Sequence, residues 1–160
     1  MKAKPTLAVA AALLAALIHA SGAAAAEEDK TADRLLRAAE GLQMPSSEAD
    51  SSWSVLSFAG TEEPPDAARF GEISGCPEGG TTRLDFEDTL ERLGTVEPWM
   101  DDGQASSARG FRKLEGVFER EFGEKVAVYR CDPGGPEVNV YFVGADEGAL
   151  VALETVSIET

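Results

Sequence analysis

The clearest hydrophobic pattern in the chain lies over residues 111–160 and predicts one helix followed by three strands. The apolar residues that recur at spacings of three and four, and so share one helical face, are Phe111, Leu114, Phe118 and Phe122. Gly123 is expected to end this helix in the left-handed conformation. Ser106 or Ser107 is expected to cap its start. The pattern therefore predicts a long helix that buries one face.

Three apolar runs follow this helix, and each has the length and side-chain types of a strand: residues 126–130, 138–143 and 149–158. The first two runs flank residues 132–136, whose Asp-Pro-Gly-Gly-Pro sequence favours a chain reversal. We therefore expect a three-stranded, mostly antiparallel meander packed against the helix.

Weaker patterns upstream predict further elements: helices at residues 31–42, 66–73 and 86–93, and strands at residues 53–58 and 81–85. Asp85 is expected to cap the third of these helices, and Gly94 is expected to end it. Helices that precede and separate the strands of one sheet indicate the α+β class.

Residues 1–26 have the order of charged, apolar and small residues that is typical of a secretory signal. Two lysines precede an apolar run at residues 7–18, and small residues extend to Ala26. Cleavage near Ala26 would leave residues 27–160 as a single domain, exported to the bacterial periplasm or secreted. An uncleaved membrane anchor is the alternative, because residues 7–26 could span about 30 Å of hydrocarbon. The small residues favour cleavage, and with it a mature chain free of the membrane.

The charge of the mature chain limits the partners it could bind. Residues 27–160 hold 12 basic residues against all 29 acids, a formal charge of −17. Direct nucleic-acid binding is therefore excluded, since it requires a basic surface. The same charge suits a protein partner with a positive groove, although it could also serve only to keep an exported chain in solution.

The mature chain contains no histidine, because the single histidine, His19, lies in the signal. This excludes Ser-His-Asp and Cys-His nucleophiles and histidine-based zinc sites. Adjacent acids occur, but no stretch fits a calcium-binding loop. We expect no cofactor and no metal site of the chain's own.

The two cysteines, Cys76 and Cys131, are expected to form one disulfide, because an exported chain meets oxidising conditions. Two separate free thiols are the alternative. A bond would tie down the long irregular stretch at residues 60–80, because Cys76 lies in its closing segment.

Trp99 follows Pro98 in an irregular, acidic stretch at residues 96–103. It is either a loop aromatic that folds back onto the core or an exposed anchor for a protein partner, since tryptophan often dominates binding energy when it fills a partner's pocket.

Several short pieces of the chain, in their order and spacing, resemble the nuclease A inhibitor family, whose members block sugar-non-specific nucleases. The resemblance covers the chain from about Arg34 to Thr160. The matching pieces are residues 41–44 ahead of a serine-rich turn, Pro64-Pro65, residues 84–86, Trp99 with Asp101-Asp102, residues 111–114, 128–130 and 140–144, and the closing Glu159-Thr160.

The resemblance implies a three-layer α-β-α sandwich and a binding mode. Inhibitors of the family occupy the DNA groove of the nuclease, and their C-terminal threonine, matched here by Thr160, approaches the catalytic magnesium through a water. Trp99 matches an aromatic contact residue of the family. Two further family contacts are acidic, but the matching positions here are Ser46 and Pro98.

Nearby acids could replace those two missing charges: Glu48, Glu97 or Asp101. Our hypothesis is a non-enzymatic protein inhibitor of a magnesium-dependent nuclease, monomeric when free, that binds through these residues, Trp99 and Glu159-Thr160. The alternative, favoured by Ser46 and Pro98, is an exported binding module of the same fold with another target. A hydrolase that works through paired carboxylates is a third hypothesis.

Overall fold

The computed structural model describes residues 26–45, 47 and 50–159. Apart from its last residue, the segment interpreted as a signal therefore lies outside the described residues. The chain divides into two compact units, Met1–Asp33 and Arg34–Thr160. The described residues of the first unit are helical.

The second unit begins with helical residues 34–39. The helix expected at residues 31–42 thus ends three residues early. A turn follows, in which Gly41 has a φ of 77°, a left-handed conformation that glycine adopts without strain.

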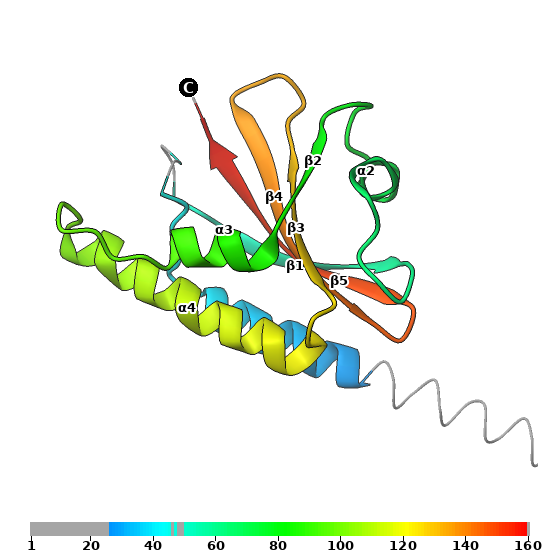
Figure 1. The fold of residues 1–160 in the computed structure, drawn as a ribbon, viewed down its shortest axis with the longest axis horizontal. Helices are drawn as coiled ribbons and strands as arrows, with labels where there is room; N and C mark the ends of the chain where they lie inside the picture. Colours follow the sequence, from blue (N-terminus) through cyan, green and yellow to red (C-terminus); the bar gives the residue numbers. More distant parts are fainter. Residues whose placement is uncertain (1–25, 46, 48–49, 160) are drawn as a thin grey trace, which may run out of the picture. The chain divides into compact units, whose positions relative to one another are not determined.

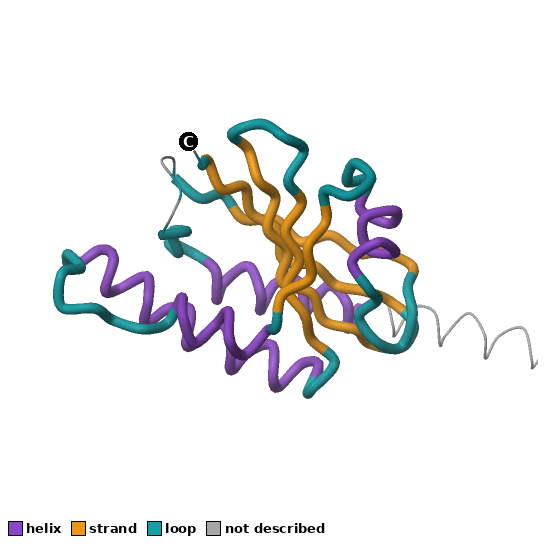
Figure 2. Tube along the Cα trace, turned by 45° about the horizontal axis from the view of Figure 1, so that its top comes forward, coloured by secondary structure: helices purple, strands orange, loops and turns teal. Residues whose placement is uncertain are grey.

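The described residues of the second unit form a five-stranded sheet in the order β1-β5-β4-β3-β2 (Figures 1 and 2). The strand bounds are Trp53–Ala59 for β1, Thr81–Leu84 for β2, Val126–Cys131 for β3, Glu137–Asp146 for β4 and Ala149–Ile158 for β5. All four strand pairings are antiparallel. The predicted C-terminal meander and the predicted α+β class are confirmed.

Three further helices of the described chain lie in the second unit: α2 (Ala67–Ser74), α3 (Phe86–Leu93) and α4 (Asp102–Phe122). The predicted cap of α3 is confirmed, because the Asp85 carboxylate accepts a hydrogen bond from the backbone N–H of Asp88 at 2.9 Å. Gly94 follows the last helical residue, as expected. None of the described helices is long and apolar enough to cross a membrane.

The start of α4 corrects the prediction that Ser106 or Ser107 caps this helix. Its N-cap is Asp101, so both serines lie inside the helix. At the other end, Gly123 follows the last helical residue as predicted, but its φ of 60° and ψ of −129° lie outside the left-handed helical region.

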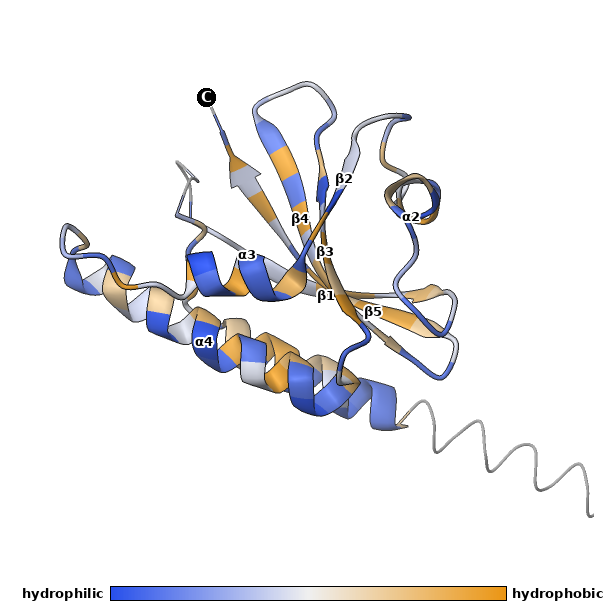
Figure 3. Ribbon diagram, in the orientation of Figure 1, coloured by the Kyte–Doolittle hydropathy of each residue, from blue (hydrophilic) through white to orange (hydrophobic). Residues whose placement is uncertain are grey.

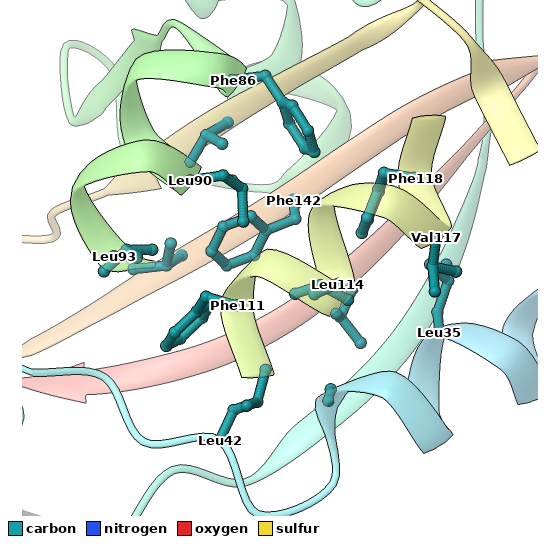
Figure 4. Close-up of a cluster of buried hydrophobic side chains, with 14 of the residues drawn as sticks. Leu35, Leu42, Phe86, Leu90, Leu93, Phe111, Leu114, Val117, Phe118 and Phe142 are labelled. Carbon is teal, nitrogen blue, oxygen red and sulfur yellow. The ribbon is translucent and has the colours of Figure 1, made fainter. Parts of the chain in front are cut away.

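One face of the sheet packs against α3 and α4. Side chains alternate between the faces of a strand, and Val128 of β3, Phe142 of β4 and Leu153 of β5 point toward these helices. Figure 4 shows Phe142 beside Leu90 of α3 and Phe111 of α4. Figure 3 shows apolar and polar residues interspersed along α4, as expected of an amphipathic helix.

The opposite face of the sheet packs against α2. Phe70 of α2 stacks on Tyr129 of β3, with ring centroids 3.9 Å apart. Burial raises the pKa of Tyr129 to about 12, so its hydroxyl stays protonated and donates a hydrogen bond to the Pro65 carbonyl. The predicted disulfide joins Cys76, just after α2, to Cys131 at the end of β3, with 5.8 Å between the Cα atoms. Core packing and one covalent bond thus hold α2 on the sheet.

Candidate partner-binding site

Trp99 lies at the tip of a reverse turn between α3 and α4. The Met100 backbone N–H donates to the Glu97 carbonyl at 3.1 Å and closes the turn. Pro98 then occupies the second position of the turn, which its fixed φ favours. Trp99 is 69% exposed. Its ring therefore does not fold back into the core and is open to solvent.

Asp101 fixes the far side of this turn. Its carboxylate accepts a hydrogen bond from the Gln104 backbone N–H at 2.8 Å, and the Gln104 side-chain oxygen accepts one from the Asp101 backbone N–H at 3.0 Å. This reciprocal pair is a capping box. Asp101, a predicted partner contact, thus also has a structural role at the start of α4.

Replacing Asp101 with alanine should lower the free energy of unfolding by about 1 kcal/mol, because the cap hydrogen bond is lost. Asp101→Asn should cost much less, since asparagine caps helices nearly as well. Urea denaturation of the two variants measures both effects. Equal losses would show that the charge, rather than the hydrogen bond, stabilises this helix end.

A groove of about 500 Å³ lies beside Trp99. We call it the Trp99 groove. Its walls come from the segment before β1, the α3–α4 connection and the first turns of α4, and they include Met44, Ser47, Asp50, Trp99, Met100 and Phe111.

Ser107 holds the segment before β1 against α4. Its hydroxyl accepts a hydrogen bond from the Gln43 backbone N–H at 2.8 Å and donates one to the Gln43 carbonyl at 3.2 Å. Gly110, one turn further along α4, leaves room for Leu42, whose Cδ2 would lie 2.2 Å from a Cβ at that position. The groove therefore has a wall that is fixed at two points.

The C-terminal end of β5 lies next to the same segment (Figures 1 and 2). The Ile158 backbone N–H donates to the Ser47 hydroxyl at 3.1 Å, and Ser47 also lines the groove. Glu159 is held by its own backbone N–H, which donates to the Pro136 carbonyl at 2.7 Å, and by an ion pair with Arg130 at 2.8 Å.

The predicted contact residues therefore divide into two sets. Pro98, Trp99, Asp101 and Glu159 are described, and the contacts of Ser47 connect the groove beside Trp99 with the strand end that carries Glu159. Ser46, Glu48 and Thr160 lie outside the described residues.

The charge of the described part of this surface is negative. Asp50 lines the groove, and Glu97, Asp101 and Asp102 are exposed on either side of the Trp99 turn. No lysine or arginine is among the described residues that line the groove. Among all the described residues, no group of three or more His, Cys, Asp or Glu side chains could hold a metal ion.

A comparison with protein families decides which proteins this chain resembles. A family model described as nuclease A inhibitor-like protein matches residues 29–160. The chain belongs to the nuclease A inhibitor-like protein family. No curated protein matches it.

Membership of the nuclease A inhibitor-like family confirms the resemblance found in the sequence and indicates a protein partner such as a nuclease. Sequence reasoning identified Trp99 but missed the groove beside it. The signal available was the Pro98-Trp99 pair, which favours a turn that exposes the ring. The other wall, around Met44 and Ser47, carries no sequence signal that links it to Trp99.

Proposed function

We propose that this chain is an exported inhibitor of a sugar-non-specific, magnesium-dependent nuclease and has no catalytic activity of its own. The observation that carries the proposal is the exposed Trp99 turn beside an acidic groove, in a chain that belongs to the nuclease A inhibitor-like family. The proposed contact residues are Ser46, Glu48, Pro98, Trp99, Asp101, Glu159 and Thr160.

Simple electrostatics supports this function. A nuclease groove carries lysine and arginine for the phosphates of DNA, together with a divalent cation. An acidic protein is attracted to such a groove and competes with the substrate. The formal charge of −17 on residues 27–160 fits this role.

The contacts of Glu159 support a role for the residue after it. Two interactions, with Pro136 and Arg130, hold Glu159 beside the end of β5. Thr160 would then leave a fixed point of the fold, and its hydroxyl or carboxylate could replace a phosphate oxygen near the magnesium. This part of the proposal rests on the family resemblance.

Removing Thr160 should weaken inhibition strongly, whereas the intact mature chain should inhibit at a stoichiometric ratio. The measurement is DNA degradation by a magnesium-dependent, non-specific nuclease, preferably one exported by the same organism. Asp146→Asn is the matched control, because it changes an exposed side chain at the β4–β5 turn, at the opposite end of β5, and keeps Glu159 and Thr160; it should inhibit as the parent chain does. Full inhibition by the chain that lacks Thr160 would rule out the metal-directed contact.

A second candidate function is a binding module of the same fold with a different target. Pro98 favours it, because this position matches an acidic contact in the family and here serves the turn. Salt dependence separates the two functions. Inhibition through an acidic surface should weaken as salt rises toward physiological strength, whereas binding through an apolar pocket should not.

Export is part of the proposal. The disulfide between Cys76 and Cys131 supports it, because such bonds persist in oxidising compartments. Residues 1–26 would supply the secretory signal, and residues 27–160 would form the mature inhibitor.

A further inference from the structure

The Trp99 groove combines apolar walls with a single type of charge. Leu93 and Phe111, both buried, contribute to the walls at the α3 and α4 side, and the half-buried Met44 and Met100 contribute flexible thioether side chains. Trp99 adds an exposed aromatic ring. Among the described lining residues, the charged group is the carboxylate of Asp50.

Several polar groups of the walls have partners within the described chain. Ser107 and Gln43 bind each other, and the Gln104 side-chain oxygen accepts from the Asp101 backbone. Within the described part of the chain, no hydrogen bond or ion pair engages the Asp50 carboxylate. Among the described side chains that line the groove, the exposed Asp50 carboxylate is thus an open acceptor with a negative charge.

We propose that this groove receives an arginine side chain of the partner protein, with Asp50 as its counter-ion. The inference rests on the proposed function and adds to it a specific contact. The methylene groups of arginine would pack on Met44 and Met100. The guanidinium would lie against the ring of Trp99 and bind the Asp50 carboxylate.

Charge complementarity selects this occupant over an apolar one. An apolar side chain would fill the walls equally well, but it would supply no donor to the exposed Asp50 carboxylate, whereas a guanidinium supplies charge-assisted hydrogen bonds. Glu97 and Asp102, exposed beside the turn, add attraction for a cation. A nuclease groove that binds phosphates is also rich in arginine.

Peptide titration tests the groove without a nuclease. The probes are a capped Gly-Arg-Gly peptide and its citrulline analogue, which has the same shape but no charge. NMR follows the indole N–H of Trp99 at millimolar peptide. The indole N–H of Trp53, which donates to the Leu42 carbonyl at 3.0 Å, reports whether the fold stays intact. We expect a saturable shift of Trp99 with the arginine peptide and a much smaller one with citrulline.

Two matched variants complete the experiment. Asp50→Asn removes the charge from the groove, and Asp146→Asn removes an exposed charge at the β4–β5 turn, at the opposite end of β5 from Ile158. Asp50→Asn should abolish the preference for arginine over citrulline and raise the inhibition constant by about tenfold, the effect of losing a hydrogen bond to a charged group. Asp146→Asn should change neither the preference for arginine over citrulline nor the inhibition constant.

The outcomes separate this inference from the proposed function. Equal responses of Trp99 to both peptides, with equal inhibition by both variants, would overturn the arginine site while the nuclease-inhibitor function stands. An arginine preference that depends on Asp50, in a chain that inhibits no nuclease, would support the site and overturn the proposed function.

Discussion

Replacing Trp99 with alanine is expected to raise the inhibition constant about a hundredfold, equivalent to about 2.7 kcal/mol of binding free energy. An exposed aromatic anchor contributes this much when it becomes buried in a partner. The ring is 69% exposed in the free chain, so its loss should change the free energy of unfolding by less than about 0.5 kcal/mol.

The matched control for this prediction is Val96→Ala. Val96 belongs to the same connection between α3 and α4 and is 46% exposed, but it lies outside the Trp99 turn. Inhibition assays of both variants give the inhibition constants, and urea denaturation gives the free energies of unfolding. If Trp99→Ala and Val96→Ala weaken inhibition equally, Trp99 is not the anchor. If Trp99→Ala destabilises the fold by more than 1 kcal/mol, its ring has a structural role.

Removing the disulfide is expected to lower the free energy of unfolding by about 4 kcal/mol, the loop-closure entropy for a cross-link across 55 residues. The bond joins Cys76 and Cys131 in the cluster on the α2 side of the sheet. The Trp99 groove uses Leu93 and Phe111 of the other cluster. Inhibition should therefore persist wherever the variant remains folded.

The double variant Cys76→Ser/Cys131→Ser, studied by urea denaturation, measures this loss. Chemical reduction of the parent chain is the control, because it breaks the same bond without changing other atoms. A loss below about 1 kcal/mol in both samples would contradict the loop-closure explanation. Loss of inhibition in a fully folded variant would show instead that the bond shapes the binding surface.

The sheet could be predicted from sequence because local pattern and tertiary structure agree there. The run at residues 149–158 became β5 with the predicted bounds, and Asp85 and Gly94 limit α3 as expected. In each case the deciding signal lies within a few residues of the element it defines.

The start of α4 could not be predicted as well, because three candidate caps compete within seven residues. Gly103 makes an early start unfavourable by about 1 kcal/mol relative to alanine. The capping box of Asp101 and Gln104 outweighs this cost. Ser107 is occupied elsewhere, since its hydroxyl binds Gln43 across 64 residues of sequence.

The candidate binding site, too, could be predicted only in part from the sequence. Trp99 and Pro98 are adjacent in sequence, so a turn that exposes the ring could be proposed. The Trp99 groove could not, because Met44 and Ser47 reach it only through the packing of a distant segment on α4. A single sequence contains no record of that contact.

The contacts of Glu159 have a consequence for the thermodynamics of binding. Arg130 and Pro136 belong to the β3–β4 hairpin and its turn, whereas Ser47, which binds Ile158, precedes β1. The strand end is therefore clamped from two sides in the free protein. The entropy lost in ordering it belongs to folding and is not lost again on association. Under the proposed function, this preorganised end would meet the nuclease without a coupled disorder-to-order transition.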